Sequence, residues 1–566
     1  MQDIWVGNLA EASIHIHRIS KHVSIEDNMT TPDTKIYDFV IIGSGFGGSV
    51  SAMRLAEKGY SVLVLERGKR FEDEDFPKTN WNIWKSLWLP FLHSFGLWEL
   101  SFLNGAIALR GNGVGGGSLM YANVLMETDD RLFEASSWHH LADWKTILRP
   151  HYATAKRMLG VTTNPRLWKA DEILREIAVE RGVADTFHPT EVGVFFGVEN
   201  GTVPDPYFNG EGPARVGCNF CGGCMVGCRY NAKNTLPKNY LYFAEKLGVR
   251  ILPEVTVRDI RPLTGQSQDN AHYEVEYHKT TAWVSHPRLM VRARNVIVAA
   301  GALGTLELLF RCREQTHSMP RLSQRLGYNV RTNSENLQGA VSRDKEMDYS
   351  KGIAITSIFS ADRVTNIEPV RFSDGSSLIR NITAPLTEGK NIPIRMIRTF
   401  WEIIRHPIDF LYGRFFSRWA RHTTILLMMQ PVEELLRVRF GRNIFTLFRK
   451  GVMFDTEEGV QLPKSPAISN AITRQFARKM NGIPQASFMD SLFNFPITAH
   501  FMGGVPLGRD ENEGVVDVDF QVHNYPGLYV VDGSIMPGNP VVNPSLTITA
   551  LAEYAMSHIP VKRQAA

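Results

Sequence analysis

Glycines and one carboxylate near the N-terminus have the types and spacing of a dinucleotide-binding loop. The run Gly43-Ser44-Gly45-Phe46-Gly47-Gly48 follows an apolar stretch, Tyr37 to Ile42, and precedes a helix-like stretch. In such a loop the first glycine allows a tight turn, the second lets backbone approach a pyrophosphate, and the third lets the helix pack on the strand. Glu66 ends the next apolar strand, where a carboxylate accepts hydrogen bonds from a ribose diol. The sequence therefore predicts a nucleotide-binding strand–helix–strand unit.

Three further segments have the composition of chain that returns to the same nucleotide-binding sheet. Residues 111–118 form a glycine-dense, amide-rich loop that is suited to wrap a flat ring system. Residues 295–301 read as a strand that ends in a glycine turn before a helix. Residues 528–534 read as a buried strand and a turn, after which Asn543-Pro544-Ser545 caps a final helix, Leu546 to His558.

Length and composition set the broad class. The chain has 566 residues, of which 43% are hydrophobic and 21% charged, as expected for a globular protein with two large lobes. Sixty-two basic and 58 acidic side chains give a net charge of +4, which is too balanced to predict a nucleic-acid-binding surface. The N-terminus lacks the features of a secretion signal, so we expect a cytoplasmic protein.

The first residues of the chain are predicted to be an extension. The extension is expected at residues 1–34: its first 28 residues are polar, and Met29, which follows them, is a candidate native start. His15, His17 and His22 have no acidic or cysteine cluster beside them, so we interpret them as solvated side chains and not as a metal site.

Four of the five cysteines lie in one short run, and Cys312 stands alone. The run has the spacing C-x2-C-x2-C-x3-C, which bacterial ferredoxins use for iron–sulfur clusters, although the proline that follows it there is Arg229 here. A reducing compartment disfavours disulfides. Two interpretations stay open: buried thiols in a glycine-rich loop, or ligands of an iron–sulfur cluster, which would be Cys218, Cys221, Cys224 and Cys228.

These segments together resemble the glucose–methanol–choline (GMC) oxidoreductase family over residues 36–559. Within that family the likeness is to bacterial cholesterol-oxidase-like proteins, through GVGGGSLMYAN at 113–123, CGGCMVGCRYNAKNTL at 221–236 and VVDGSIMPGNPVVNPSLTITALAE at 530–553. The resemblance implies an α/β fold, with a Rossmann-like FAD-binding lobe built from discontinuous segments and a substrate lobe with an antiparallel β-sheet. We expect the FAD-binding domain at 35–330 with 496–566, and the substrate domain at 331–495.

The cofactor implied by the resemblance is noncovalent FAD, since no histidine occurs between Ser118 and Asn123, where choline oxidases attach the flavin. Residues at the pyrophosphate, the ribose, the adenine and along the flavin follow from the matched motifs. The implied FAD contacts are Gly43, Gly45, Gly48, Glu66, Gly113, Gly115, Gly116, Ser118, Asn123, Val257, Asp532, Gly533, Asn543 and Ser545.

The catalytic residues implied by the resemblance are His500 and Asn543. Alcohol oxidation needs a base near the flavin, because a proton leaves the hydroxyl as hydride leaves the carbon. His500 lies in the His-x-x-Gly-Gly pattern of the family, and Asn543 matches the asparagine that pairs with this histidine at the substrate hydroxyl. Glu368 has two open interpretations: the active-site glutamate that moves a proton during double-bond isomerisation, or an exposed carboxylate at a strand end.

Two aromatic segments bear on the substrate. Aromatic side chains between Trp81 and Phe102 recur every three or four residues, the spacing of one helix face, although Pro90 and Gly96 should break or bend a helix there. Residues 391–422 combine six arginines, two acidic residues and several aromatic side chains in a helix-compatible insertion. This insertion is either a peripheral contact with an anionic membrane or a solvated helical cover.

The predicted function is FAD-dependent oxidation of a bulky apolar secondary alcohol, a 3β-hydroxysterol, to the ketone. Two alternatives stay open. One is an FAD-dependent dehydrogenase of another lipid or long-chain alcohol that passes electrons to a carrier and not to oxygen. The other is a membrane-associated electron-transfer flavoprotein with the cysteine run as a redox centre.

Overall fold

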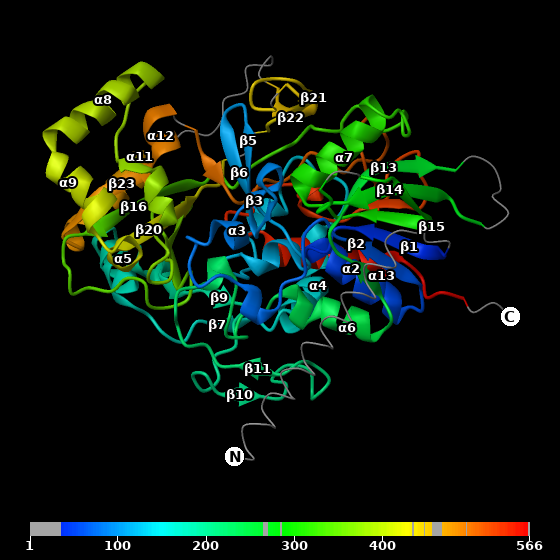
Figure 1. The fold of residues 1–566 in the computed structure, drawn as a ribbon, viewed down its shortest axis with the longest axis horizontal. Coiled ribbons are helices and arrows are strands. Elements are labelled where there is room, and N and C mark those ends of the chain that lie inside the picture. The colour runs from blue at the N-terminus through cyan, green and yellow to red at the C-terminus, as the bar shows by residue number, and fades with distance from the viewer. Residues whose placement is uncertain are drawn as a thin grey trace.

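Two seven-stranded sheets divide the molecule into two lobes in the computed structural model (Figure 1). The structure describes residues 35–263, 270–283, 286–432, 435–446, 448–455, 467–493 and 495–563. The predicted N-terminal extension, with Met29 and its three histidines, lies outside the described residues. In Figure 1 one lobe lies on the right, with the C-terminus, and the other lies on the left.

The right-hand lobe is built on a mixed sheet with the strand order β12-β2-β1-β15-β14-β13, and β25 pairs with β15. The parallel strands are β1 (Ile36–Ile42), β2 (Val62–Leu65), β12 (Arg250–Leu252), β15 (Leu289–Val298) and β25 (Leu528–Val530). The antiparallel strands are β13 (Val255–Pro262) and β14 (Tyr273–Lys279). The central strands β1 and β2 are almost entirely buried, because helices cover both faces of the sheet there.

Helices from distant parts of the chain pack around this sheet. They are α2 (Phe46–Glu57), α4 (Trp144–Met158), α6 (Tyr240–Lys246), α7 (Ala302–Glu314) and α13 (Ser545–His558), and α13 contacts both α2 and α4. The C-terminal helix thus packs on the first helix of the described chain. This lobe therefore holds segments from both ends of the sequence, as the discontinuous FAD-binding lobe requires.

The left-hand lobe is built on an antiparallel sheet with the strand order β19-β23-β16-β20-β18-β17-β8. Its strands are β8 (His188–Pro189), β16 (Asn336–Ser342), β17 (Ser357–Ser360), β18 (Asn366–Val370), β19 (Thr383–Pro385), β20 (Thr423–Met429) and β23 (Gly482–Ser487). Helices α5 (Lys169–Glu180) and α11 (Ala467–Lys479) pack on this sheet and share one apolar cluster with β16, β18 and β20. The predicted α/β fold with two lobes is confirmed.

Several smaller sheets lie outside the two large ones. A three-stranded sheet joins β5 (Trp98–Leu103), β6 (Ala106–Gly111) and β24 (Ile497–Thr498), and the chain reaches His500 directly after β24. Two-stranded sheets pair β3 (Trp88–Leu89) with β4 (Ser94–Phe95), β7 (Thr162–Thr163) with β9 (Glu191–Val192), and β10 (Thr202–Val203) with β11 (Arg215–Val216). His500 is therefore placed by strands that come from opposite ends of the sequence.

One of the two strands predicted for the substrate sheet is confirmed and one is wrong. The predicted strand Thr423 to Gln430 appears as β20 (Thr423–Met429) in the large sheet. The predicted strand Leu436 to Phe440 appears as β21 (Val438–Gly441), but it pairs only with β22 (Gly451–Phe454) in a separate two-stranded sheet. The prediction that it joins the substrate sheet is therefore wrong, because β23, not β21, takes the place beside β16.

The aromatic stripe between Trp81 and Phe102 is not one helix. Ile83–Ser86 is α-helical (α3) and Pro90–Leu92 forms a 3-10 turn, while β3, β4 and β5 make up most of the rest, and β5 pairs with β6. Pro90 lacks the N–H that a continuous helix would need at this position. The segment 391–422 is helical: α8 (Ile392–Arg405), α9 (Pro407–Leu411), a π-helical turn (Tyr412–Phe416) and α10 (Trp419–His422). α8 contacts α12 (Phe488–Phe493) at the outer side of the left-hand lobe (Figure 1).

Candidate active site

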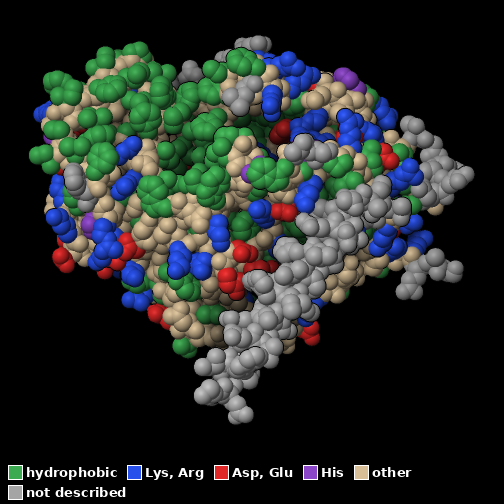
Figure 2. Space-filling view, viewed as in Figure 1, with side chains coloured by type: hydrophobic (Ala, Val, Ile, Leu, Met, Phe, Trp, Pro, Cys, Tyr) green, Lys and Arg blue, Asp and Glu red, His purple; other side chains and the backbone are tan. Residues whose placement is uncertain are grey.

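One cavity of about 2670 Å³ lies between the two lobes. It is lined by the glycine loop after β1, by the strands of the left-hand sheet and by the segment that carries His500. A typical ligand pocket measures about 300–1,000 Å³, so this cavity has room for a dinucleotide and a bulky second molecule together. Figure 2 shows a hollow between the lobes with hydrophobic side chains around it. Hydrophobic side chains also cover the neighbouring helices α8 and α12.

The glycine loop has the backbone geometry that a dinucleotide requires. Gly43 adopts a φ of +100°, and a Cβ on it would lie 2.3 Å from the carbonyl oxygen of Ala299. A Cβ on Gly48 would lie 2.0 Å from the carbonyl oxygen of Gly43, so only glycine lets α2 approach β1 this closely. Gly43 and Gly48 therefore allow the tight turn and the close packing of α2 on β1, and the N-terminus of α2 lies at the cavity, where it would stabilise a pyrophosphate.

Glu66 connects this loop to the end of β2. Its Oε2 accepts hydrogen bonds from the amide (3.0 Å) and the hydroxyl (2.7 Å) of Ser44, and its Oε1 accepts one from the amide of Gly68 (2.8 Å). Glu66 also lines the cavity. Oε1 accepts only one of these bonds, so its second lone pair lets Glu66 hold the loop and also accept a hydrogen bond from a ribose hydroxyl.

The predicted FAD contacts divide into two groups. Those that line the cavity are Gly43, Gly45, Glu66, Gly116, Val257, Gly533, Asn543 and Ser545. The other predicted contacts lie behind the residues that line the cavity and support them: Gly48, Gly113, Gly115, Ser118, Asn123 and Asp532. Ser118, for example, donates to the carbonyl of Gly115 (2.7 Å) and accepts from the amide of Leu236 (3.1 Å), which fixes the 113–118 loop.

Asp532 ties the C-terminal turn to α7. It accepts hydrogen bonds from the hydroxyl of Thr305 (2.5 Å) and from the amide (2.8 Å) and the hydroxyl (2.6 Å) of Ser534. Burial raises the pKa of Asp532, although these hydrogen bonds act against that rise. Its neighbour Gly533 lies in the cavity wall, so Asp532 positions backbone and does not itself face the cavity. The residues around the cavity thus fit FAD.

His500 is held by a carboxylate that the sequence analysis did not identify. Nδ1 of His500 lies 2.5 Å from Oε1 of Glu335. The other carboxylate oxygen of Glu335 accepts a hydrogen bond from the amide of Ala499 (2.9 Å). Burial raises the pKa of Glu335, but the His500 imidazole and hydrogen bonds from Thr498 and Ala499 lower it by more, so the net pKa is below its usual range.

This contact selects a tautomer of His500. An ionised Glu335 accepts the proton on Nδ1, which leaves Nε2 as the unprotonated nitrogen of the ring. Nδ2 of Asn333 also approaches Nδ1, at 3.3 Å, but it donates a shorter hydrogen bond to the carbonyl of Val542 (2.8 Å). His500 lines the cavity, so Nε2 is the ring nitrogen available to a ligand as a base.

Asn333 also links His500 to the segment that carries Asn543. Its Oδ1 accepts a hydrogen bond from the amide of Val541 (3.1 Å), and its Nδ2 binds the carbonyl of Val542. Asn543, the next residue, lines the same cavity as His500. The structure thus brings the two predicted catalytic residues to one wall of the cavity. The sequence carries no signal for Asn333 and Glu335, because no spacing pattern connects them to the histidine turn.

Glu368 is a buried residue of β18 and not an exposed carboxylate at a strand end, so the second interpretation of this residue is wrong. Its side chain has no exposed surface. Burial raises the pKa of Glu368 to about 8, Asn543 acts in the opposite direction, and the negative charge of Glu335 adds to the rise. A carboxyl group with this pKa is protonated at neutral pH.

The four-cysteine run does not have the geometry of a cluster site. Among the described residues, no group of three or more His, Cys, Asp or Glu side chains is placed to hold a metal ion. Burial raises the pKa of Cys218, Cys221 and Cys224, that of Cys221 to about 12, whereas cluster ligands are thiolates. The buried-thiol interpretation fits this geometry, and the iron–sulfur prediction finds no support in it.

Family models for the GMC oxidoreductases match residues 37–331 and 470–552. The chain is 46% identical over 530 residues to a cholesterol oxidase from Acinetobacter baumannii, an alignment that covers 93% of this chain and 95% of that protein. It is 42% identical over 546 residues to a cholesterol oxidase from Mycobacterium tuberculosis, with 93% of this chain and 91% of that protein covered.

Solved structures share the fold at low sequence identity. A pyridoxine 4-oxidase from Mesorbium loti superposes with a TM-score of 0.57 at 16% identity, covering 92% of this chain and 99% of that one. An FAD-dependent oxidoreductase from Chaetomium thermophilum superposes with the same TM-score at 15% identity, covering 92% of this chain and 98% of that one.

Proposed function

The chain belongs to the GMC oxidoreductase family and is an FAD-dependent alcohol oxidoreductase, and from this premise we propose that it oxidises a 3β-hydroxysterol to the 3-ketosteroid. The proposal rests mainly on one observation: His500, whose Nδ1 contacts Glu335, lies in a cavity with largely apolar walls. Beside His500, the cavity is walled by apolar side chains of the left-hand sheet, among them Leu337, Val370, Ile425 and Leu427. A fused-ring alcohol would bury its rings against these side chains.

His500 is proposed to remove the hydroxyl proton. Bound FAD supplies the acceptor for the hydride that leaves the alcohol carbon. Nε2 of His500 takes the proton of the substrate hydroxyl, and Glu335, at 2.5 Å from Nδ1, stabilises the imidazolium that results. The side chain of Asn543 would bind the same substrate oxygen, since it lines the cavity with His500.

The similarity to the two cholesterol oxidases supports both the sterol substrate and oxygen as electron acceptor. A second candidate substrate is a long-chain alcohol, because a long-chain-alcohol oxidase from Arabidopsis thaliana is 22% identical over 566 residues, covering 92% of this chain and 67% of that protein. The higher identity to the cholesterol oxidases favours the sterol. An electron carrier in place of oxygen has no comparable support.

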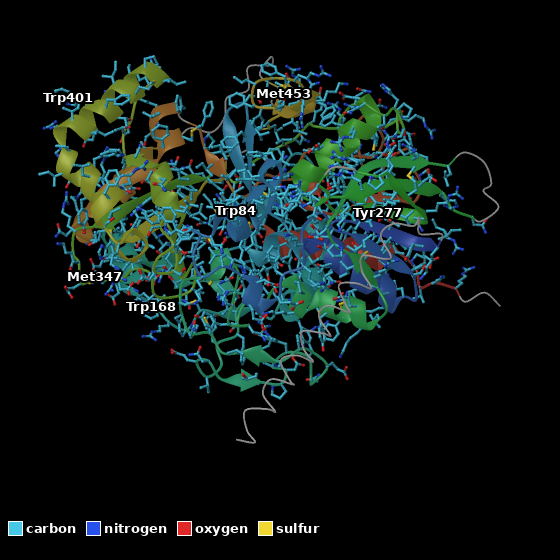
Figure 3. All side chains as sticks on the ribbon, viewed as in Figure 1. Trp84, Trp168, Tyr277, Met347, Trp401 and Met453 are labelled. Atoms are coloured by element: carbon cyan, nitrogen blue, oxygen red, sulfur yellow. The ribbon has the colours of Figure 1, made fainter. Side chains whose placement is uncertain are left out.

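The surface around the cavity supports contact with a lipid surface. Seven large, exposed apolar side chains among the described residues also line the cavity and define what we term the apolar mouth: Phe91, Leu100, Phe102, Trp283, Ile382, Phe448 and Phe488. Beside it, α8 exposes Ile397, Phe400, Trp401 and Ile404, and Figure 3 places Trp401 on the outer side of that helix. Exposed apolar patches of this kind mark interaction sites, and a sterol has to leave a lipid phase to enter the cavity.

Charge contributes less to this surface than the sequence predicts. Three of the arginines in residues 391–422 are paired: Arg395 with Asp490 (3.3 Å), Arg418 with Asp374 (2.7 Å) and Arg421 with Asp348 (3.7 Å). Among the described residues, no helix is long and apolar enough to cross a membrane. The proposed contact is therefore a peripheral one that rests on apolar side chains more than on anionic lipid.

The proposal is tested by anaerobic reduction of the flavin. Purified holoprotein is mixed with a detergent-dispersed 3β-hydroxysterol, and in parallel with a long-chain primary alcohol, while the flavin absorbance is recorded. We expect the sterol to bleach the flavin band faster. His500→Ala should retain the flavin and slow bleaching by about 100-fold or more, because it removes the base. Bleaching by the long-chain alcohol alone would assign that substrate instead, and an unchanged rate in His500→Ala would remove His500 from the mechanism.

A further inference from the structure

One lysine lies buried between two loops of the cavity wall. Lys233 is 1% exposed, and among the described residues no carboxylate pairs with it. Its Nζ instead donates three hydrogen bonds to backbone carbonyls, those of Leu119 (3.0 Å), Tyr121 (2.8 Å) and Cys224 (2.8 Å). Leu119 and Tyr121 end the glycine-dense segment that we term the 111–122 loop, and Cys224 belongs to the four-cysteine run. Lys233 therefore binds two loops that are far apart in the sequence.

The three hydrogen bonds require the charged form of this lysine. An ammonium group has three N–H donors, whereas a neutral amine has two, and the three carbonyl oxygens can only accept. Nζ also lies 4.6 Å from the ring centroid of Tyr121, which adds a cation–π contact. Burial lowers the pKa of Lys233 to about 7, and the thiols of Cys224 and Cys228 act in the opposite direction. Below pH 7 a positive charge therefore lies between the two loops.

The main chain around Lys233 keeps the side chain in this place. Lys233 forms an isolated antiparallel bridge with Val194, and its carbonyl accepts a hydrogen bond from Arg215 (2.9 Å), which is itself buried. The hydroxyl of Tyr121 donates a hydrogen bond to the carbonyl of the next residue, Asn234 (3.1 Å). The lysine and the 111–122 loop are thus connected through the main chain as well as through Nζ.

Both loops that Lys233 binds contribute to the cavity wall, although Lys233 itself does not line the cavity. Met120 and Tyr121 line it from the 111–122 loop, and Met225 lines it from the four-cysteine run. The ring of Tyr121 also contacts Phe46 in the glycine loop after β1, with ring centroids 5.8 Å apart. The family resemblance implies that the 111–122 loop lies along the flavin. Lys233 therefore lies behind the part of the wall where the flavin is expected.

We propose that Lys233 is a positioning residue that ties the 111–122 loop to the four-cysteine run and holds a positive charge behind the flavin. The tie fixes Tyr121 and Met225 relative to each other, and with them two parts of the cavity wall. Hydride transfer brings negative charge to the flavin, so a buried positive charge that no carboxylate neutralises favours the reduced form. The inference depends on the FAD of the family and does not depend on the proposed sterol.

Three substitutions separate the tie from the charge. Lys233→Arg keeps the charge and the N–H donors, Lys233→Gln keeps two donors without the charge, and Lys233→Met lacks both. Lys145→Met is the matched control, because it removes the charge of an exposed lysine of α4 that does not line the cavity. All variants are measured as holoprotein at pH 6, where the lysine carries its charge.

The first measurement is the reduction potential of the flavin, by anaerobic equilibration with a reference dye and without substrate. Lys233→Gln and Lys233→Met should shift the equilibrium about tenfold toward oxidised flavin, which is about 30 mV for a two-electron couple. Lys233→Arg and Lys145→Met should keep the wild-type potential. A wild-type potential in Lys233→Gln would overturn the proposal. So would a potential in Lys233→Arg as low as that of Lys233→Gln, because disturbed packing would then explain the shift.

The second measurement is amide hydrogen exchange, followed by mass spectrometry of peptides. In Lys233→Met, peptides from 111–122 and 218–228 should exchange about tenfold faster than in the wild type, while those of β16 and β20 should not change. Unchanged exchange in both loops would overturn the tie. If Lys233→Met does not retain the flavin, Lys233→Gln takes its place, since it also loses the charge and one of the three donors. Neither measurement uses a sterol, so a wrong substrate would not affect the result.

Discussion

At the scale of single residues, the reactivity of His500 depends on Glu335. The 2.5 Å contact of Glu335 with Nδ1 settles which nitrogen carries the proton, and Asn333 connects the same site to the turn of Asn543. Glu335 is buried, and it keeps a lowered pKa because the histidine and two hydrogen bonds outweigh the effect of burial. Its negative charge is therefore present at neutral pH, where an imidazolium would form during the reaction.

Glu335→Gln should lower kcat by about 10- to 100-fold with little change in KM. The amide keeps the shape of the carboxyl group but neither fixes the Nδ1–H tautomer nor stabilises the imidazolium. Steady-state kinetics and the flavin spectrum of the purified variant check this, with Glu346→Gln as an exposed control. A kcat equal to that of the wild type would show that Glu335 is only a structural partner of His500.

At the scale of elements, helix α8 has one side bound to the protein and another side with exposed apolar side chains. Its inner side is fixed by Arg395, which is buried and bonded to the carbonyl (2.6 Å) and the carboxylate (3.3 Å) of Asp490 in α12. Its outer side exposes isoleucine and aromatic side chains, with Trp401 at 61% exposure and Ile404 at 70%. A helix that only covers a soluble protein would place polar side chains there. This division supports a lipid-facing role for α8.

Replacing Ile397, Trp401 and Ile404 together by aspartate should reduce binding to phospholipid vesicles that contain sterol by about tenfold or more, since each change removes apolar area and adds charge. Activity on detergent-dispersed sterol should change little. Vesicle sedimentation and oxidation of vesicle sterol check this. The control is Val179→Asp with Val198→Asp, which alters two exposed apolar side chains outside α8 and the apolar mouth. Equal loss of vesicle binding in this control would contradict the assignment to α8.

At the scale of the whole molecule, the cavity is formed by both lobes, and neither lobe closes it alone. The glycine loop and Glu66 come from the right-hand lobe, whereas Leu337 and Leu427 come from the left-hand sheet. A ligand that fills the cavity contacts both. Binding to the folded state alone stabilises that state in proportion to the logarithm of ligand concentration.

Removal of FAD should therefore lower Tm, and FAD returned at 100 times its Kd should restore about 2.7 kcal/mol of stability. Differential scanning calorimetry of the apoprotein with increasing FAD checks this. FMN at the same concentrations should raise Tm less, because it lacks the adenosine that Glu66 and Val257 are predicted to contact. A Tm that does not depend on FAD would mean that the cavity does not hold the cofactor.

Local patterns in the sequence predicted the parts of the fold that depend on neighbouring residues. The glycine loop, β1, α2, α13 and the helices of residues 391–422 all follow from turn chemistry and periodicity over short stretches. The aromatic stripe at 81–102 misled the same reasoning. The four-residue spacing of Trp98 and Phe102 is also compatible with one face of a strand, and both residues lie in β5, which pairs with β6.

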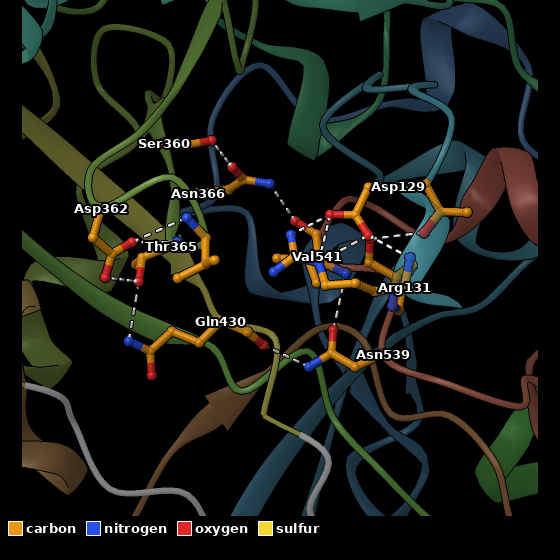
Figure 4. Close-up of polar contacts among 12 residues, drawn as sticks. Asp129, Arg131, Ser360, Asp362, Thr365, Asn366, Gln430, Asn539 and Val541 are labelled. Atoms are coloured by element: carbon orange, nitrogen blue, oxygen red, sulfur yellow. Dashed lines mark hydrogen bonds and ion pairs between the residues drawn. The ribbon is translucent and has the colours of Figure 1, made fainter. Parts of the chain in front are cut away.

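The sequence by itself determined the two-lobe α/β fold, the nucleotide-binding loop and the identity of His500 and Asn543 as candidates, because each is written in a continuous run of residues. Only the tertiary structure decided that Glu335 holds His500, that Glu368 is buried beside Asn543, and that apolar side chains ring the cavity. These contacts depend on which segments lie side by side in the folded chain. No local spacing in the sequence predicts that β18, through Asn366 (Figure 4), and Asn333, just before β16, both contact the turn at 539–543. Burial, which sets the charge of Glu335 and Glu368, is likewise a property of the packed molecule.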